Sequence, residues 1–285
     1  MFLSEKMKER RLTVVPTGGL ANRMRAIASA YALCKATNRN LKIIWQRNGE
    51  LNASFSDLFK ADGLVDIVEI NPILFQFYYE SPRKKNLFLP QILHLFSGRH
   101  WIYFINEKNA FMTEDYFLEV AQKEIKHINV MTCYPFYDRF DQEIVNKLFQ
   151  PSLKVEKRIK EILKNAVPDI AIQIRRTDHT WAIENSPTSM FEKFMEKEIS
   201  NNPDITIFLA TDDQEIKNLF KAKYGKNIIF NPIKASRDNT EGMIDGAAEL
   251  FIMSRCKKIY GSYNSSYSFF ASLFGPSELI VVKQN

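Results

Sequence analysis

The 285-residue chain is long enough for one large domain or two of ordinary size, and its 45% hydrophobic and 25% charged residues are typical of a soluble globular protein. A formal charge of +6 suits an anionic ligand, but Lys and Arg are spread along the chain and no recognised nucleic-acid motif occurs, so no nucleic-acid partner is expected. No apolar run approaches the ~20 residues that span a bilayer, and residues 1–11 lack a signal-peptide core. We therefore expect a cytoplasmic protein without a transmembrane segment.

Cysteine and histidine positions argue against disulfides and zinc. Cys34, Cys133 and Cys256 lie far apart and form no CxxC pair, which suggests a reducing compartment. The four histidines show no zinc-ligand spacing. We expect no metal site.

The first half opens with a strand over 12–15, a turn over 16–19, a helix over 20–37 and a second strand over 41–45. This β-turn-α-β unit is the usual start of a doubly wound sheet. The pair Gly18 and Gly19 lets the backbone approach a ligand closely, at a helix N-terminus that attracts anions. The pair is not a GxGxxG motif, so by itself it is a weak signal.

Residues 72–140 are crowded with aromatic side chains, and strand and helix periods are hard to separate there. Core packing is the expected role of most of these rings. A second interpretation makes 88–96 an element that contacts a membrane surface or an acceptor, so peripheral membrane contact stays open.

Helices and strands alternate through the second half. Helices are predicted over 155–166, 191–199, 214–224, 243–254 and 267–274, and strands from 170 and over 205–210, 228–231, 258–262 and 279–282. Alternation of this kind favours a parallel α/β sheet. We predict an α/β fold with two Rossmann-like domains, 1–150 and 151–285, facing a cleft.

The most informative stretch is the strand that begins at Ile170 and ends in Arg175, Arg176, Thr177 and Asp178. Ligands in open α/β sheets bind at the carboxyl ends of strands, and a guanidinium fork suits a phosphate. The alternative is that the arginines form a surface salt bridge with Asp178.

Further polar groups fall where other strands of this half end, or on the helix that precedes one of them. Each has a structural alternative: Asp213 or Thr211 as a helix cap, Asn264 and Ser265 as turn and cap residues, and Asp245 with Glu249 as a solvated helix face. Convergence at one sheet edge favours a binding site. The candidates are Thr211, Asp212, Asp213, Asp245, Glu249, Asn264, Ser265 and Ser266.

Four segments together resemble the fucosyltransferase superfamily, most closely the α-1,6-fucosyltransferases (bacterial nodulation enzymes and the animal core enzyme) and the protein O-fucosyltransferases. Residues 172–178 (IQIRRTD) resemble the motif HxRRTD, 208–213 (FLATDD) the second motif, and 250–266 the third. Residues 18–25 (GGLANRMR) resemble the glycine-rich, Asn-bearing loop that these enzymes place across the cleft. The resemblance covers 12–58 and 170–275 and is absent between about 72 and 150.

This resemblance implies a GT-B-like fold that holds GDP-fucose in the C-terminal half. Arg175 would bind the β-phosphate, Arg176 would be held by Asp212 or Asp213, and Ser265 would contact the diphosphate. Glu249 would read the guanine, with Asp245 as the alternative. The implied donor-binding set is Gln173, Arg175, Arg176, Asp212, Asp213, Asp245, Glu249, Asn264, Ser265 and Ser266.

Two departures concern catalysis. Gln173 replaces the histidine of HxRR, so no imidazole is available there. The core enzyme's glutamate aligns with Ile183, and Glu184 comes one residue late. The catalytic base therefore stays open among Glu184, Asp178 and His179.

The N-terminal loop, with Gly18, Gly19, Asn22, Arg23 and Arg25, is expected on the acceptor side of the cleft, and Asn22 joins Arg175, Glu184 and Asp178 in the implied catalytic set. Met24 and Ile27 are spaced to pack inward. The alternative for Asn22 is a helix cap.

The leading hypothesis is an inverting, metal-independent glycosyltransferase that moves fucose from GDP-fucose to a glycan or glycoconjugate acceptor. The pair Asp212-Asp213 lacks the spacing of a DxD manganese site. The alternatives are another nucleotide sugar on the same fold, or a non-catalytic nucleotide-binding module.

Overall fold

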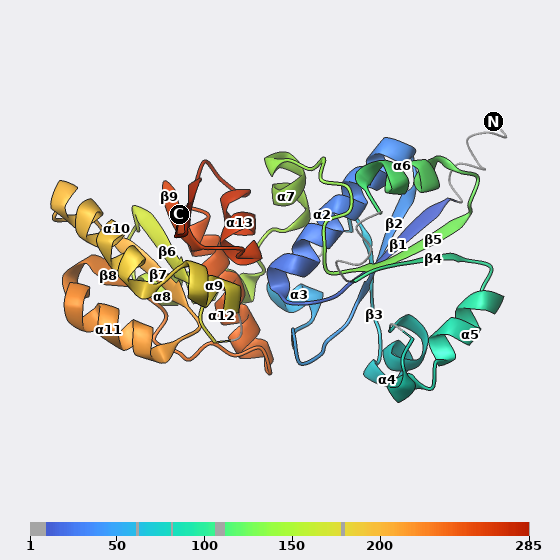
Figure 1. Cartoon of the computed structure of the whole chain (residues 1–285), viewed down its shortest axis with the longest axis horizontal. Helices are drawn as coiled ribbons and strands as arrows, with labels where there is room; N and C mark the ends of the chain where they lie inside the picture. The colour runs from blue at the N-terminus through green and yellow to red at the C-terminus, as the bar shows by residue number, and fades with distance from the viewer. Residues whose placement is uncertain (1–9, 61–62, 81, 106–111, 178–179, 285) are drawn as a thin grey trace. The chain divides into compact units, whose positions relative to one another are not determined.

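Figure 1 shows a computed structural model of the chain, which describes residues 10–60, 63–80, 82–105, 112–177 and 180–284. The chain divides into two compact units, with residues 1–56 and 61–149 in unit 1, and 57–60 and 150–285 in unit 2. The sequence placed a single division at 150. The short segment 57–60 joins unit 2 because Phe59 forms an antiparallel bridge with Pro151, and Ser152 Oγ donates to Asp57 O at 2.7 Å.

Unit 1 is built on a parallel five-stranded sheet in the order β3-β2-β1-β5-β4. Val14 on the central strand is level with Ile43 and Val130 on its two neighbours. The strands β1 and β2 were predicted, whereas the others lie in or before the aromatic region that periodicity left unassigned. The strands are β1 Arg11–Pro16, β2 Asn40–Trp45, β3 Asp66–Glu69, β4 His100–Phe104 and β5 His127–Thr132.

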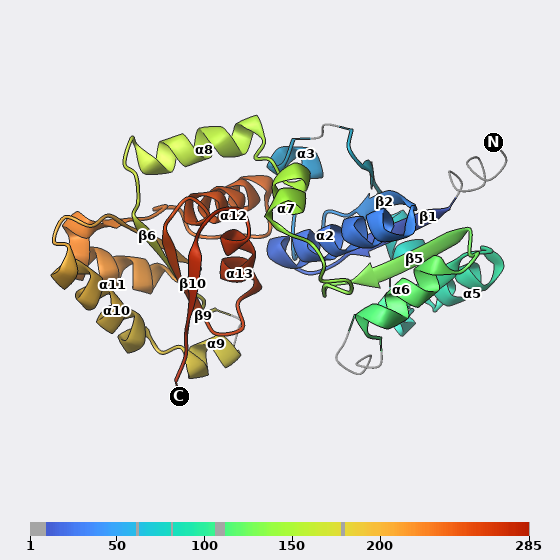
Figure 2. The same ribbon diagram turned by 90° about the horizontal axis from the view of Figure 1, so that it is seen from above.

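Helices cover both faces of the unit 1 sheet (Figures 1 and 2). The helix α2 (Leu20–Thr37) packs on β1 and β2 and contacts α6 (Glu114–Gln122) and α7 (Gln142–Leu148). On the other face, Phe75 of a π-helix (Phe75–Tyr79) joins Val15, Ile44 and Met131 in a core cluster. The short helices α3 (Phe55–Leu58), α4 (Pro72–Leu74), α5 (Leu89–Phe96) and a 3₁₀ turn (Lys84–Asn86) complete the described elements before α6.

Unit 2 has a second parallel five-stranded sheet, in the order β10-β9-β6-β7-β8. Its strands are β6 Ile170–Ile174, β7 Ile207–Thr211, β8 Ile228–Ile229, β9 Lys258–Ser262 and β10 Glu278–Val282. Its helices are α8 Leu153–Leu163, α9 Thr180–Asn185, α10 Thr188–Asn201, α11 Gln214–Tyr224, α12 Thr240–Met253 and α13 Ser266–Ser272, with a 3₁₀ turn at Gly225–Asn227. The predicted alternation of helices and strands is confirmed, and both units are α/β and Rossmann-like.

The alternation of side chains along β6 decides which residues reach which layer. Ile170, Ile172 and Ile174 belong to a buried cluster with Phe191 of α10 and Phe220 of α11. Successive strand residues point to opposite faces, so Gln173 points to the face that α12 and α13 cover. The order β9-β6-β7 also brings the carboxyl ends of these three strands side by side, which is where the polar residues gather.

Candidate functional site

Arg175 is fixed at the end of β6 by groups on both neighbouring strands. Its main-chain N–H donates to Ser262 Oγ at the end of β9, at 2.9 Å. Its guanidinium lies 2.7 Å from Asp212 Oδ2, directly after β7. The side chain of Arg175 keeps 20% of its surface exposed. The cation is therefore partly buried and oriented, at the sheet edge where ligands bind.

Asp212 organises the loop that follows β6. Besides the Arg175 ion pair, its carboxylate accepts the main-chain N–H of Arg176 at 2.8 Å and the hydroxyl of Thr177 at 2.8 Å. Asp178 and His179 lie outside the described residues, so the alternative of a salt bridge with Asp178 stays untested.

Arg176 has a different partner set from the one that the resemblance implied. Asp212 binds it only through the main chain, while its guanidinium donates to the carbonyls of Arg175 and Ser186 and to Thr188 Oγ1, at 2.8 to 2.9 Å. Burial lowers the pKa of this guanidinium below its usual value, with Asp212 and Asp213 acting in the opposite direction. Arg176 therefore stabilises the loop from inside.

Gln173, in place of the motif's histidine, is buried and connects two strands. Its Oε1 accepts the main-chain N–H of Ser262 at 3.4 Å, and its main-chain carbonyl accepts the Ser262 hydroxyl at 3.2 Å. Ser262 in turn supports Arg175. The amide thus supports the strand end beneath Arg175.

Asp213 caps helix α11, as the structural alternative proposed. Its Oδ1 accepts the N–H groups of Glu215 at 2.7 Å and Ile216 at 3.3 Å. These bonds satisfy first-turn donors that would otherwise lack partners. Asp213 is therefore a helix cap, and its implied role in donor binding stays a prediction.

The loop after β9 begins helix α13. Asn264 is exposed and has a φ of 54°, in the left-handed region that asparagine tolerates. Ser265 is the N-cap residue, but its side chain makes no capping hydrogen bond. A Cβ on Gly261 would lie 2.3 Å from Ser268 Oγ, so glycine there allows α13 to pack against β9. This packing positions Ser265 and Ser266, both half-buried, beside the strand end.

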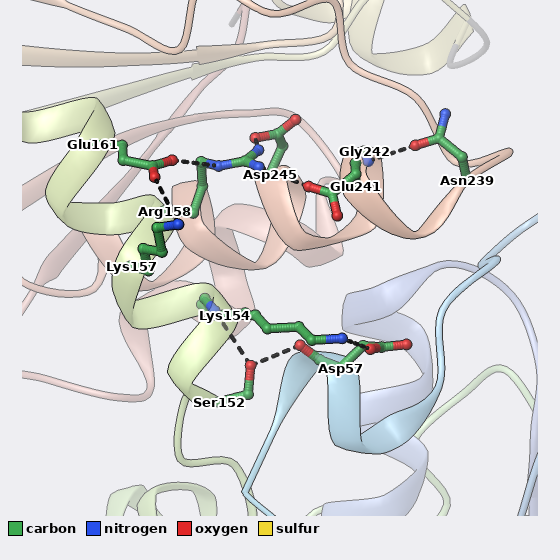
Figure 3. A network of polar contacts seen from close by, with 11 residues as sticks. Asp57, Ser152, Lys154, Lys157, Arg158, Glu161, Asn239, Glu241, Gly242 and Asp245 are labelled. Carbon is green, nitrogen blue, oxygen red and sulfur yellow. Dashed lines mark hydrogen bonds and ion pairs between the residues drawn. The ribbon is translucent and has the colours of Figure 1, made fainter.

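Asp245 is occupied by an ion pair that joins two helices (Figure 3). Its carboxylate binds Arg158 of α8, whose guanidinium also contacts Glu241 at 2.7 Å and Glu161 at 3.1 Å. Asp245 is 4% exposed, so it is not part of a solvated helix face. The ion pair with Arg158 links α8 to α12 and already engages this carboxylate, and the implied alternative that Asp245 binds guanine stays a prediction.

Glu249 is also buried, but its carboxylate has a different environment. It is 7% exposed, and no described residue donates a hydrogen bond to it. Burial raises its pKa to about 8; nearby Lys217 lowers that value, and Asp245 and Asp212 raise it. Lys217, 1% exposed, donates to Ile233 O at 2.7 Å, and burial lowers its own pKa. Glu249 is a buried acceptor with an electrostatic partner.

Three positions in this region carried no functional signal in the sequence analysis. Ser186 Oγ donates to Val282 O at 2.5 Å and accepts the N–H of Tyr263 at 2.8 Å, which joins the ends of β9 and β10. The phenol of Tyr267 donates to Gly246 O beside Glu249. Lys217 could have been found, because it lies three residues before buried Phe220 on the apolar face of α11.

In unit 1, Gly18 has a φ of +80°, in the left-handed region that favours glycine. Its N–H donates to Glu50 Oε2 at 3.0 Å, and an added Cβ would lie 3.0 Å from Asn22 Nδ2. The turn therefore favours glycine for its conformation, and an added Cβ would crowd the Asn22 side chain.

Arg23, expected as a residue of the cleft loop, supports this turn from within. It is fully buried and donates to Gly18 O at 2.8 Å, to Gln46 O, and to Asn48 Oδ1 at 2.9 Å. Its guanidinium lies 5.1 Å from the ring centroid of Trp45. Burial lowers its pKa to about 10, against the opposing effect of Glu50.

Asn22 does not cap its helix. Gly19 is the N-cap residue, and the Asn22 Oδ1 instead accepts from the Arg25 guanidinium at 2.8 Å. Burial lowers the pKa of Arg25, while Cys133, Asp138 and Tyr134 act in the opposite direction. Met24 and Ile27 are buried, as their spacing predicted.

Glu184 is exposed on α9, and its carboxylate makes no hydrogen bond or ion pair with a described residue. Nothing in the described structure brings it to Arg175. Within the same residues, no group of three or more His, Cys, Asp or Glu side chains could hold a metal ion. No described helix is long and apolar enough to cross a membrane.

Taken chemically, the edge of the unit 2 sheet combines an oriented guanidinium, a serine-rich helix start and a buried carboxylate. A guanidinium fork matches phosphate oxygens, and a carboxylate can accept two parallel N–H groups. The arrangement suits a phosphorylated ligand with a donor-rich ring.

Comparisons with known proteins give a match in structure only. No protein-family model and no curated protein sequence matches the chain. NodZ fucosyltransferase from Bradyrhizobium matches with a TM-score of 0.61 and 16% identity over 94% of both chains. A variant of FUT1 from Arabidopsis thaliana in complex with GDP matches with a TM-score of 0.65 and 13% identity, over 97% of this chain and 70% of that one.

POFUT1 in complex with GDP-fucose also matches, with a TM-score of 0.57 and 12% identity over 95% of this chain and 98% of that one. Agreement over nearly the whole chain at such low identity is agreement of fold. The predicted GT-B-like fold is thereby confirmed, and this chain has the fold of the fucosyltransferase structures.

Proposed function

We propose that the protein is a glycosyltransferase that binds GDP-fucose in unit 2 and transfers fucose to a glycan or glycoconjugate acceptor. The observation that carries the proposal is Arg175, held at the end of β6 by Asp212 and Ser262. The fold supports it, because NodZ has been soaked with GDP-fucose and POFUT1 crystallised with GDP-fucose.

The proposed reaction breaks the bond between the fucose anomeric carbon and a β-phosphate oxygen. The electron pair leaves with GDP, and Arg175 stabilises the charge that develops on the diphosphate. A cation already oriented by Asp212 needs little reorganisation in the transition state, which is the basis of electrostatic catalysis. The acceptor hydroxyl attacks from the opposite side, inverts the anomeric carbon and gives its proton to a base. Glu184, Asp178 and His179 remain the candidates for that base.

Guanine recognition is assigned to Glu249. Ionised, its carboxylate would accept the N1–H and the N2 amino group of guanine. Asp245 is excluded from this role in the proposal because Arg158 occupies its carboxylate. Ser265, at the start of α13, is assigned to the diphosphate, with Asn264 and Ser266 beside it.

We also propose that transfer needs no metal ion. Asp212 already accepts from Arg175, Arg176 and Thr177, so its carboxylate is satisfied by protein donors. Asp213 is engaged at the start of α11. Arg175 takes the place of a divalent cation in balancing the negative charge of the diphosphate.

Calorimetric titration with GDP, UDP, CDP and ADP, each with and without EDTA, tests this assignment. We expect GDP to bind at least ~10-fold more tightly than the other nucleotides, since guanine offers Glu249 two donors that no other base presents together. EDTA should leave the affinity unchanged.

Equal affinity for UDP would exclude the guanine assignment. Loss of binding in EDTA that manganese restores would exclude metal independence. Tight GDP binding without turnover of GDP-fucose would favour another sugar or a non-catalytic module.

In unit 1 we propose that the loop with Asn22 and Arg25 serves the acceptor side. Asn22→Ala and Arg25→Ala should each lower turnover of GDP-fucose about 10-fold or more by loosening the position of the acceptor. The GDP affinity and the melting temperature should stay near those of the wild type, because Asn22 caps no helix.

Asp141→Ala is the matched control in the same unit. Asp141 is a true cap, whose Oδ1 accepts the N–H of Ile144 at 3.0 Å. This variant should lose about 1 kcal/mol in unfolding free energy and keep its turnover. If Asn22→Ala instead behaves like Asp141→Ala, the residue has a structural role only.

A further inference from the structure

Half of the exposed large apolar side chains in the described chain fall within residues 73–96 of unit 1. Phe96 is 86% exposed and Leu95 is 78% exposed. The apolar surface, as we call it, consists of Ile73, Leu74, Leu87, Phe88, Ile92, Leu93, Leu95 and Phe96. Single exposed apolar residues are ordinary, but a group this dense marks an interaction site. The aromatic rings at 88 and 96 are therefore not core residues, in contrast to the expectation for most aromatics of this region.

Helix α5 carries much of this surface. It packs against the rest of unit 1 through one face only. Pro90 and His94 are its buried residues. The His94 ring stacks on Trp101 with a centroid distance of 3.5 Å and hydrogen-bonds to the Tyr103 hydroxyl and to Tyr78 O. The helix is thereby held against β4 while Leu93, Leu95 and Phe96 stay exposed. Figure 1 shows α4 and α5 together on one side of the unit 1 sheet.

The turn before α5 is also held in place by hydrogen bonds. Asn86 is fully buried, accepts the N–H of Arg83 at 2.9 Å and donates to Gln76 O at 3.1 Å. Leu87 and Phe88 follow with φ values of 56° and 54°, a left-handed pair that is unusual for bulky residues. The chain keeps this unfavourable backbone conformation, and both side chains are exposed to solvent.

The charged residues along this stretch of the chain are mostly basic. Lys84, Lys85 and Arg99 are exposed. Glu80 is the one acidic residue between 71 and 105, and it is paired with Arg83. An apolar helix face bordered by basic side chains matches the interface of a bilayer that contains anionic lipid.

The charges also favour a bilayer over a second copy of the chain as the partner of the apolar surface. In a two-fold dimer the same patch meets itself, so Lys84, Lys85 and Arg99 would approach their own counterparts without acidic residues to balance them. A bilayer surface supplies both the apolar layer and the negative charge. With eight residues, α5 is too short to span and would lie in the plane of the interface.

We propose that the apolar surface is a membrane-docking surface, which inserts the apolar side chains of α5 and the preceding turn into a bilayer containing anionic lipid. The basic residues at 84, 85 and 99 contact the headgroups. Docking requires neither GDP nor an acceptor, so it stands apart from the proposed transfer reaction.

Vesicle co-sedimentation tests the proposal, with the full chain, phosphatidylcholine vesicles, and vesicles with a third of phosphatidylglycerol. The wild type should bind the anionic vesicles and be largely released by high salt. Leu95→Ser/Phe96→Ser should weaken binding at least ~10-fold through lost apolar insertion. Lys84→Glu/Lys85→Glu should weaken binding to anionic vesicles at least ~10-fold and remove the salt dependence.

Two matched variants control for surface chemistry elsewhere. Leu153→Ser/Val167→Ser removes two apolar side chains of similar exposure from unit 2, and Lys221→Glu/Lys226→Glu makes the same charge change there. Both should bind vesicles like the wild type. All variants should keep the wild-type circular dichroism spectrum and melting temperature, since each altered side chain is exposed.

Several results would overturn the proposal. One is wild-type protein that stays in the supernatant with both kinds of vesicle. Another is equal weakening by the unit 2 controls, which would indicate non-specific adsorption. A third is a concentration-dependent dimer in sedimentation velocity that Leu95→Ser/Phe96→Ser abolishes without any vesicle binding, which would make a second copy the occupant.

Discussion

Arg175→Ala should lower the rate of fucose transfer at least ~100-fold while the protein folds normally. The guanidinium ends a strand and is partly exposed, and the main chain beneath it is held by Ser262 independently of the side chain. Asp212 would keep its hydrogen bonds from Arg176 N–H and Thr177, so the loop should retain its conformation. Single-turnover kinetics with GDP-fucose, alongside thermal unfolding, measure the two effects separately.

The neighbouring arginine gives the opposite expectation and serves as the matched control. Arg176→Ala removes a guanidinium that satisfies two carbonyl oxygens and a hydroxyl inside the loop. It should cost about 2 kcal/mol of unfolding free energy, since buried acceptors would lose their donors. Arg175→Lys should remain slow, because a point charge does not reproduce the fork. An Arg175→Ala protein with wild-type transfer and donor hydrolysis would refute the phosphate role.

The position of Arg175 could be predicted because its signal is local. A run of β-branched residues that ends in two arginines marks a strand end, and parallel α/β sheets bind ligands there. Its partners could not be predicted, because they depend on strand order and register. Ile174 is level with Thr211, which places Asp212 beside Arg175. A register between β6 and β7 that was shifted by one residue would have placed the next carboxylate, Asp213, beside Arg175.

The same reasoning explains why the burial of two charged residues was not predicted. Arg23 and Lys217 are buried charges, and composition alone classes such residues as surface. Their burial follows from tertiary partners: carbonyl oxygens and Trp45 for Arg23, and Ile233 O with Glu249 for Lys217. Asp245 looked equivalent to Glu249 one helical turn away, and only the approach of Arg158 from α8 distinguishes them.

The strands of unit 1 were predicted unevenly for a physical reason. β1 and β2 are apolar runs bounded by a turn and a helix. β3 is four residues long with no fully buried member, and β4 is a string of aromatic residues whose pattern fits strand or helix. The exposure of α5 ran against the usual rule that apolar side chains pack inward, so a sequence reading could raise a membrane role for 88–96 only as an alternative.

Glu249→Gln should weaken GDP binding by about 1.5–3 kcal/mol at pH 8.5 and remove a pH dependence that the wild type shows. In the folded protein burial raises the Glu249 pKa from 4.5 to about 8, so the carboxyl is largely protonated at pH 7. Accepting two guanine donors requires the ionised form. Below pH 8, GDP binding must therefore release a proton, and affinity should rise with pH by up to about 10-fold per unit before levelling off.

Stability should depend on pH in the opposite direction. Between pH 4.5 and about pH 8 the folded state holds a proton that the unfolded state has lost. The wild type should therefore lose unfolding free energy as pH rises through this window, by up to a few kcal/mol, and Glu249→Gln should not. Chemical denaturation at pH 5, 6.5 and 8 measures the difference between the two proteins.

Calorimetry in two buffers of different ionisation enthalpy separates proton release at Glu249 from the titration of GDP's own terminal phosphate, because only the former disappears in the variant. Asp245→Asn is the control, one turn away on α12. It should lose stability as its ion pair with Arg158 breaks, and keep a rise of GDP affinity with pH that levels off at a lower pH, because Asp245 no longer raises the Glu249 pKa. Equal slopes for wild type and Glu249→Gln would mean that this carboxyl does not meet the guanine, whatever its pKa. A flattened slope in Glu249→Gln alone would place a buried, proton-releasing carboxylate in the nucleotide site.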